Sequence, residues 1–378
     1  MREVGRVTDA ALALPGVDGR VALLGHSMAS DIIVRRALVD PRVAATVAIS
    51  MFSEAVTAAG PRNLLIVTGA WEPFLRNVRL AQLSAVEGET VGDPAKNTGR
   101  RAAIAPGVEH VSVLYSAAAL QEARDWLDAV FGRTSTGPVS ATGGWIVLLL
   151  SGIVLLAWPL SGLLPRSVTP PPPVAVRTFL AATLVPAVVT PVLLSFVNTR
   201  FLPVLVADYL AVHLFVYGGL SMGLLWWSGI KIDRSVWLPG LALAAYGIFV
   251  FGGALDRYVA SFMPNAARLP IIVAIAIGAL PYMLADSLVS EGGRAAWWRV
   301  LAARGAFLAS LGAAVAFDFH RLFFLLIIIP VIVLFFVIFG LMGGWVGRRT
   351  GSPLASGLGL GLILAWALGV SFPMFAPS

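Results

Sequence analysis

Residues 21–31 read VALLGHSMASD, an apolar run that breaks at a Gly-His-Ser-Met-Ala sequence centred on Ser27. The apolar residues before the break predict a buried strand, and residues 28–40 after it predict a helix. A sharp turn from strand to helix exposes the hydroxyl of its central serine at a helix N-terminus, where small neighbours let the two elements approach. The stretch therefore predicts either a nucleophilic serine or, because the motif is short, an ordinary strand–turn–helix connection.

Strands and helices alternate along the rest of the first 132 residues. Apolar runs predict strands at 20–26, 43–50, 63–70 and 101–105, and the residue pattern predicts helices at 2–14, 28–40, 74–85 and 117–131. This alternation favours a parallel, doubly wound sheet, because a parallel strand needs a crossover helix before it. The predicted fold class of this part of the chain is therefore α/β.

Two polar residues follow later predicted strands, so they are candidate partners of the serine. Glu72 comes directly after the strand at 63–70, and His110 precedes the helix at 117–131. A serine nucleophile needs a base to take its proton, and the base needs a carboxylate to orient it. Ser27, His110 and Glu72 are the catalytic candidates. The alternative is that Glu72 is a solvated loop residue and His110 has no role in chemistry.

With this turn and with partners in the order serine, acid, histidine, residues 1–132 resemble the C-terminal two-thirds of an α/β-hydrolase. The resemblance implies a serine hydrolase in which Ser27 is the nucleophile. It also implies that His110 is the general base and acid and that Glu72 is the carboxylate that orients it.

The resemblance adds two further site residues. The backbone N–H of Met28, which follows the nucleophile, is implied as a donor to the oxyanion. Family members more often carry aspartate where this chain has Glu72, so Glu54, after the preceding strand, is a reserve candidate for the acid. Ala29 stands where the family pattern has a second glycine, and a methyl group often fits there.

The resemblance does not cover the part of the family fold that precedes the nucleophile. The family has several strands there, and the loop after one of them supplies a second oxyanion donor. About nineteen residues precede the strand at 20–26, and they read as a single helix without the apolar core of a signal peptide. We therefore expect an unpaired sheet edge. The sequence predicts either an N-terminally incomplete hydrolase or a degenerate one with a non-catalytic role.

Residues 143–378 have the composition of a membrane domain, joined to the first domain by a linker at 133–142. The whole chain is 58% hydrophobic and 12% charged, with a mean hydropathy of +0.86, whereas soluble domains carry about 25% charged residues. Apolar segments of about twenty residues, enough to cross a bilayer as a helix, predict a bundle of about eight spans. These lie at 143–164, 176–197, 201–227, 236–255, 269–289, 297–317, 322–346 and 354–375.

The net charge of +7 belongs to the membrane domain. Residues 1–140 hold 14 Lys and Arg against 14 Asp and Glu, whereas residues 141–378 hold 13 against 6. These basic residues stand singly between apolar runs, as charges that flank spans do, so the pattern argues against a nucleic-acid partner. If Arg133 of the linker is counted with them, nine basic residues lie towards one side of the membrane and five towards the other. By the positive-inside rule, this predicts a multi-pass protein of a bacterial plasma membrane with the first domain on the extracytoplasmic side.

Ionisable residues inside the predicted spans are candidates for a second, intramembrane polar site. Asp208 and His213 lie in the same span on different faces, whereas Tyr209 shares the face of His213. Asp286 and Arg304 lie towards the same side of the membrane and can neutralise each other. The chain has no cysteine and no ligand spacing typical of a metal site, so we expect no metal and no cofactor.

Two functions from different classes remain open. The first is a membrane-anchored serine hydrolase that cleaves an ester or related acyl bond through an acyl-enzyme on Ser27, with the lipid bilayer and a small acyl or lipid-like substrate as partners. The alternative is a polytopic transporter or acyl-group translocator with an accessory or inactive hydrolase-like domain. A scaffold protein with neither activity is a third possibility. Hydrolysis would depend on Ser27 and His110, whereas transport would depend on Asp208 and His213. The sequence does not predict an oligomeric state.

Overall fold

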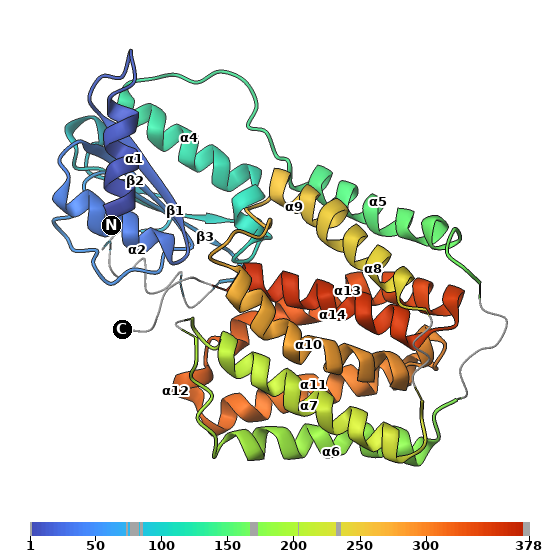
Figure 1. Cartoon of the computed structure of the whole chain (residues 1–378). Helices are drawn as coiled ribbons and strands as arrows, with labels where there is room; N and C mark the ends of the chain where they lie inside the picture. Colours follow the sequence, from blue (N-terminus) through green and yellow to red (C-terminus); the bar gives the residue numbers. More distant parts are fainter. Residues whose placement is uncertain are drawn as a thin grey trace. The chain divides into compact units, whose positions relative to one another are not determined.

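The computed structural model describes residues 2–72, 75, 83, 86–166, 173–202, 204–231 and 236–372. The chain divides into two compact units, Met1–Val147 and Leu148–Ser378 (Figure 1). The boundary falls near the start of the first membrane-length helix. The helix predicted at 74–85 lies almost entirely outside the described residues.

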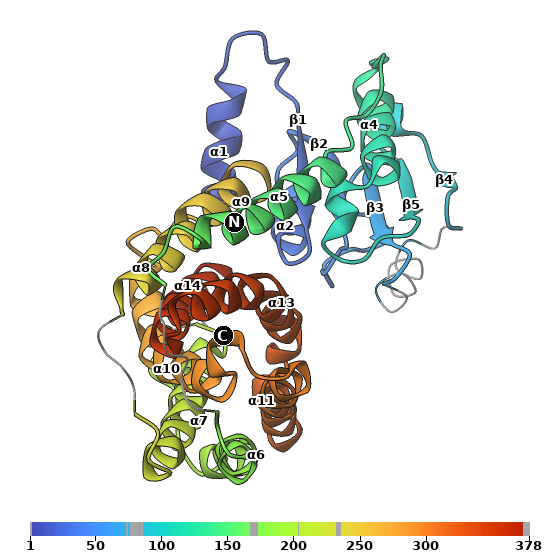
Figure 2. The ribbon, with the colours of Figure 1, turned by 90° about the vertical axis from the view of Figure 1, so that its right-hand side faces the viewer.

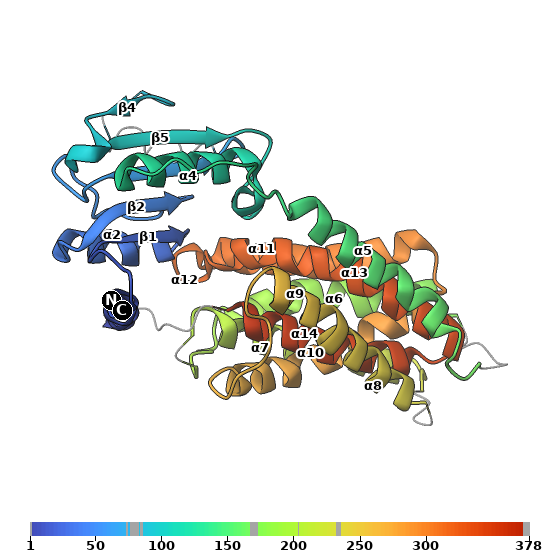
Figure 3. The same ribbon diagram turned by 90° about the horizontal axis from the view of Figure 1, so that it is seen from above.

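A sheet forms the centre of the first unit, with five strands among the described residues. The parallel strands are β1 (Val21–His26), β2 (Val43–Ile49), β3 (Leu64–Gly69) and β5 (Arg100–Ala105), and β4 (Thr90–Val91) pairs antiparallel with β5. Their order is β1-β2-β3-β5-β4, and Figure 3 shows β1, β2 and β5 pointing the same way. The four predicted strands are confirmed to within one residue at each end.

The sheet is mixed, so the prediction of a purely parallel sheet is wrong at one edge. The pattern missed β4 because its two residues, Thr90 and Val91, are both exposed and show no alternation. At the opposite edge, the described strands pair β1 with β2 alone. Leu24 of β1 is 54% exposed there, in agreement with the expected open edge.

Helices cover both faces of the sheet. The helix α2 (Ala29–Val39) places Val34 against one face, and α4 (Ala117–Phe131) places Trp126 against the other. Neighbouring residues of each central strand pack on opposite sides, so Leu65 faces α4 and Ile66 lies in the opposite cluster. Burial on both faces explains why the strands are continuous apolar runs. A further helix, α1 (Arg2–Leu12), packs on α2.

In the second unit, eight helices of the described chain are long and apolar enough to cross a membrane, which indicates a multi-pass membrane protein. They are α5 (Gly143–Ser161), α6 (Val176–Leu194), α7 (Ala207–Trp227), α8 (Leu238–Ala245) continued through the π-helical Tyr246–Phe251 into α9 (Gly252–Tyr258), α10 (Leu269–Val289), α11 (Trp297–Phe317), α13 (Leu325–Thr350) and α14 (Pro353–Ser371). The eight predicted segments are confirmed as helices. A short helix, α12 (Phe319–Leu322), joins α11 to α13.

The helix α10 is central to the second unit and packs against both α7 and α14, as Figure 2 shows. Small residues make these contacts close. A Cβ on Gly278 of α10 would lie 2.2 Å from the carbonyl oxygen of Ala211 in α7. A Cβ on Gly361 of α14 would lie 3.0 Å from the Cα of Leu280 in α10. The backbones approach so closely that larger side chains have no room at these positions.

Candidate functional site

Ser27 occupies a strained turn between β1 and α2. Its φ of 53° is in the left-handed region, which is uncommon for residues other than glycine. The Ser27 N–H donates to the carbonyl oxygen of Ile49 at the end of β2 (2.9 Å), and its own carbonyl accepts from the N–H of Ser30 (3.0 Å). The hydroxyl of Ser30 donates to the same carbonyl. These bonds hold the turn on both sides of the serine.

Gly25 lets α2 approach the strand that precedes Ser27. A Cβ at this position would lie 3.0 Å from the carbonyl oxygen of Ala29 and 3.1 Å from the Cδ1 of Ile33. Such contacts are tighter than ordinary van der Waals packing, so a side chain here would push α2 away. The small residue expected before the serine therefore has a packing reason in this structure.

Three parallel strands bring Ser27, His110 and Glu72 together. Ser27 follows β1, Glu72 follows β3 and His110 follows β5, so all three lie at the carboxyl edge of the sheet. The His110 Nε2 is 2.8 Å from the Ser27 Oγ, and its Nδ1 is 2.5 Å from the Glu72 Oε1. The three residues singled out from the sequence thus form one chain of hydrogen bonds.

Further hydrogen bonds hold the Glu72 carboxylate in place. Its Oε2 accepts from the hydroxyl of Ser50 (2.7 Å) and from the N–H of Gly69 (2.9 Å), and the side chain is buried. Burial alone raises the pKa of Glu72, but the hydrogen bonds from His110, Ser50 and Gly69 outweigh it and hold that pKa below its usual value. The carboxylate therefore remains ionised beside the imidazole.

Sequence reasoning missed Ser50 as a positioning residue. The signal was present, because Ser50 is a polar residue at the end of the apolar run 43–50, at the same sheet edge as Ser27. Nothing in that run shows which later residue the hydroxyl meets, since Glu72 is twenty-two residues away.

His26 steadies the loop that carries His110. Its Nε2 lies 2.6 Å from the backbone carbonyl oxygen of His110, and the two rings are 4.8 Å apart. Burial lowers the pKa of His26, and a carbonyl accepts only from a protonated ring nitrogen, so the neutral form carries its proton on Nε2. From the sequence, His26 is assigned only to the turn around Ser27, and its contact with the His110 loop is not predicted. The Glu109 carboxylate completes this loop by accepting the N–H groups of Val111 and Ser112, each at 2.9 Å.

Of the two further predicted site residues, Met28 lies next to Ser27, whereas Glu54 makes no hydrogen bond to the three central residues in the described structure. Met28 directly precedes α2, and the hydrogen bonds of the described residues leave its N–H without an acceptor. A donor of this kind is what the predicted oxyanion contact requires. Glu54 is exposed, and its carboxylate makes no hydrogen bond to His110 in the described structure. Glu72, rather than the reserve candidate, is the carboxylate on the imidazole.

Exposed apolar side chains occur in the loops at the same sheet edge. Phe52 follows β2, Trp71 follows β3 and Val111 follows β5, and they are 61%, 69% and 54% exposed. The N–H of Phe52 donates to the hydroxyl of Ser30, and the N–H of Trp71 donates to the Val108 carbonyl. These bonds tie Phe52 to the first turn of α2 and Trp71 to the loop that carries His110.

Asp208 and His213, the predicted intramembrane polar residues, bond to different partners in the described structure. Asp208 accepts the N–H groups of Tyr209 (2.7 Å) and Phe201 (3.2 Å), so it fixes the start of α7. His213 is fully buried, with its Nε2 3.1 Å from the Ser310 Oγ and its Nδ1 3.5 Å from the Tyr209 hydroxyl. The prediction that Tyr209 and His213 share a face is confirmed. In this arrangement Asp208 bonds the backbone at the start of α7, and His213 links α7 to α11.

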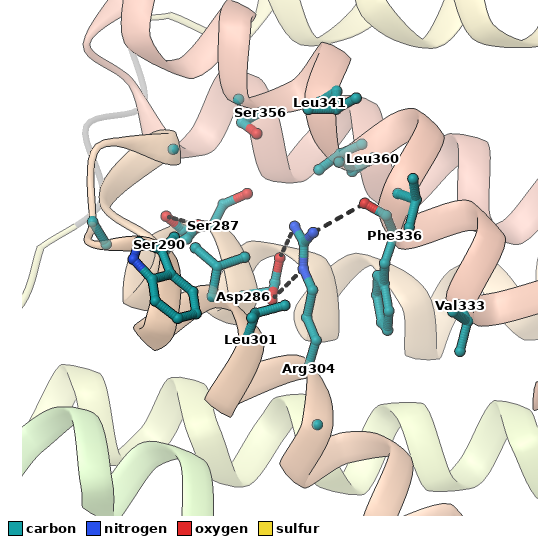
Figure 4. A pocket seen from close by; sticks show the side chains of 18 of the residues that line it. Asp286, Ser287, Ser290, Leu301, Arg304, Val333, Phe336, Leu341, Ser356 and Leu360 are labelled. Carbon is teal, nitrogen blue, oxygen red and sulfur yellow. Dashed lines mark hydrogen bonds and ion pairs between the residues drawn. The ribbon is translucent and has the colours of Figure 1, made fainter.

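A cavity of about 660 Å³ lies within the second unit, and Figure 4 shows the residues that line it. Arg304 points into it and forms an ion pair with Asp286 (3.0 Å), as expected from their neutralising charges. A second guanidinium N–H donates to the carbonyl oxygen of Phe336 (3.1 Å). The sequence did not reveal the cavity, because its walls come from α10, α11, α13 and α14 together.

Comparison with known proteins does not assign this chain to a family. No family model matches the chain, and neither a curated protein nor a solved structure gives a significant match. Within the described ranges, no three His, Asp or Glu side chains gather as metal ligands would. The geometry of the site therefore carries the functional conclusion.

Proposed function

We propose that the first unit is an α/β-hydrolase-type serine hydrolase, anchored by the membrane-length helices, that cleaves an ester or related acyl bond. The observation that carries this proposal is the hydrogen-bond chain from the Ser27 Oγ through His110 to Glu72. Its support is geometric, because nucleophile, base and carboxylate lie within hydrogen-bonding distance on three strand ends. The left-handed turn at Ser27 adds to that support.

The proposed reaction proceeds in two acyl-transfer steps. The Ser27 Oγ attacks the acyl carbonyl carbon while the Nε2 of His110 takes its proton, and Glu72 stabilises the imidazolium. The Met28 N–H donates to the oxygen that becomes negative. The imidazolium then gives the proton to the departing alcohol oxygen, which leaves an acyl ester on Ser27. Water, deprotonated by His110, attacks that ester and releases the acid.

The proposed substrate is a small acyl compound or a lipid. The support is the set of exposed apolar side chains, Phe52, Trp71 and Val111, in loops at the edge that carries Ser27. An apolar acyl group can bury surface against such side chains, which stabilises a complex by about 25 cal/mol per Å². The membrane-length helices would also keep the domain close to a lipid source.

The proposed location of the hydrolase domain is the extracytoplasmic side of a bacterial plasma membrane. The support is the larger number of Lys and Arg residues at the opposite ends of the spans. Eight spans return the C-terminus to the side of the first unit. A reporter fused after Ser378 is therefore expected to be active outside the cytoplasm, and activity inside it would refute the assignment.

A fluorophosphonate probe tests the hydrolase proposal directly, because it phosphonylates only activated serines. The full chain is treated in detergent and digested with trypsin, which releases residues 21–35 by cleavage after Arg20 and Arg35. This peptide contains both Ser27 and Ser30, so fragment ions must locate the adduct. We expect the adduct on Ser27 in native protein and none in heat-denatured protein.

An adduct on Ser30, or no adduct on either serine, would contradict the proposal. The absence of any adduct would instead favour the alternative function, a transporter or acyl-group translocator with an inactive hydrolase-like domain.

A further inference from the structure

The cavity in the second unit is a groove that runs along two helices. Its α13 lining extends from Val333 to Arg348 at three- or four-residue spacing, and its α11 lining extends from Trp297 to Leu308. At 1.5 Å per residue these stretches measure roughly 22 Å and roughly 16 Å. Half of a bilayer's hydrocarbon core is about 15 Å thick. The groove thus has the length needed to hold one acyl chain within one leaflet.

One end of this groove is polar, and the other is apolar. Trp297 begins α11 and Arg348 lies two residues before the end of α13, so both mark the same end. An N–H of Arg348 donates to the carbonyl oxygen of Gly293 in the α10–α11 connection (2.8 Å), which places this connection at that end too. Leu308 and Val333 line the far end. The groove is therefore polar at one end and apolar along the rest, which matches a lipid with a polar headgroup and an apolar acyl chain.

Among the described residues that line the groove, Arg348 at the polar end is the one cation without a carboxylate partner. Arg304 and Asp286 neutralise each other across 3.0 Å, and their side chains are 15% and 4% exposed (Figure 4). Among the described residues, no carboxylate lies within ion-pair distance of Arg348. Arg348 also reaches back over Gly344, where a Cβ would lie 3.3 Å from its guanidinium nitrogen. Its charge therefore favours an anion at this end.

Ser287 provides a second, independent sign of a ligand. Its side chain lines the groove and is 1% exposed, and its Oγ has no hydrogen-bond partner in the part of the chain that the structure describes. A buried hydroxyl without a partner costs about 1–3 kcal/mol. Ser287 lies two residues before the end of α10, at the same end of the groove as Arg348. An acceptor oxygen of a headgroup would satisfy this hydroxyl.

We propose that this groove binds an anionic phospholipid from the bilayer, with its phosphate at Arg348 and Ser287 and one acyl chain running towards Leu308 and Val333. The site is distinct from the one at Ser27 and does not depend on hydrolysis. Lipid can reach it from the surrounding membrane because most of its lining residues belong to membrane-length helices, and the others lie in the α10–α11 connection. The proposal thus assigns the second unit a specific lipid site in addition to its anchoring role.

Gly305 gives a means to block the groove. It lines the cavity, and a Cβ on it would meet nothing within 4 Å, so a larger side chain can enter without displacing backbone. Gly312 lies on the same helix, has equally open space, and does not line the cavity. Gly305→Phe therefore fills the site, and Gly312→Phe is the matched control for helix stability and hydrophobicity.

The test is photocrosslinking in phosphatidylcholine nanodiscs that contain a trace of phosphatidylglycerol with a diazirine near its acyl end. In the wild-type chain we expect crosslinks concentrated on the groove faces of α11 and α13. Gly305→Phe should lower them at least about tenfold, because losing burial of about two CH₂ groups suffices for that change. Gly312→Phe should match the wild type.

Competition with unlabelled lipids tests the headgroup. Phosphatidylglycerol should displace the probe better than phosphatidylcholine, and Arg348→Gln should remove that preference, whereas Arg349→Gln should retain it. Crosslinks spread evenly over the eight helices, or unchanged in Gly305→Phe, would overturn the proposal. Equal competition by both lipids would refute its anionic headgroup. Crosslinking in the Ser27→Ala variant should equal that of the wild type, so failure of either proposal can be recognised separately.

Discussion

Ser27→Ala is expected to lower kcat/KM for a short p-nitrophenyl ester by at least about 10³-fold, because the proposed acyl intermediate forms on the hydroxyl that this change removes. Alanine keeps the Cβ, so the conformational preference of the turn changes little. The backbone hydrogen bond from residue 27 to Ile49 does not involve the side chain and should persist. The thermal unfolding midpoint should therefore change little. The loss of activity should appear as a lower kcat.

Initial rates over a range of ester concentrations provide the measurement. Ser135→Ala is the control, since this exposed hydroxyl bonds Asp128 and lies outside the hydrogen-bond chain of the site. Ser135→Ala should retain the wild-type rate. If Ser27→Ala kept more than about a tenth of that rate, less than about 1.4 kcal/mol of transition-state stabilisation would depend on the hydroxyl. Such a result would exclude Ser27 as the nucleophile.

Glu72→Gln is expected to lower kcat about 10³- to 10⁴-fold at neutral pH, although the two side chains have the same shape. The Ser50 hydroxyl and the Gly69 N–H both donate to one carboxylate oxygen, so glutamine must keep its carbonyl oxygen there. Its NH₂ group then faces the Nδ1 of His110. The imidazole must accept at Nδ1 and carry its proton on Nε2, the tautomer that cannot take a proton from Ser27.

Glu54→Gln is the matched control, because it makes the same chemical change at the reserve position. It should retain wild-type kcat, since Glu54 is exposed and does not contact His110 in the described structure. Measuring kcat and KM for both variants separates the effects, because a wrong tautomer lowers kcat with little change in KM. A Glu54→Gln enzyme slower than Glu72→Gln would make Glu54 the orienting acid.

The sheet and the three central residues could be predicted because their signals are local. β2 and β3 are short, mostly apolar runs, as is typical of strands that are buried on both faces. Ser27 is marked by the small and polar residues that end an apolar run. Once the strands are parallel, the residues after them must share an edge, so Glu72 and His110 were expected near Ser27.

The remaining features depend on contacts that no local pattern encodes. β4 has two exposed residues and exists only through its pairing with β5. The bonds from Ser50 to Glu72 and from His26 to the His110 carbonyl join segments 22 and 84 residues apart. The groove in the second unit could not be predicted for another reason. Its helices are apolar almost all round, so periodicity does not distinguish a face towards lipid from one towards protein.

At position 27, the residue that best suits the left-handed backbone differs from the residue that the proposed reaction requires. An L-residue in this conformation costs about 1 kcal/mol that glycine does not. Substitution by glycine would relax the turn and remove the hydroxyl together. Selection for a higher melting temperature through relief of unfavourable backbone conformations would favour that change, and the more heat-resistant product would lack the hydroxyl on which the proposed acyl-enzyme depends.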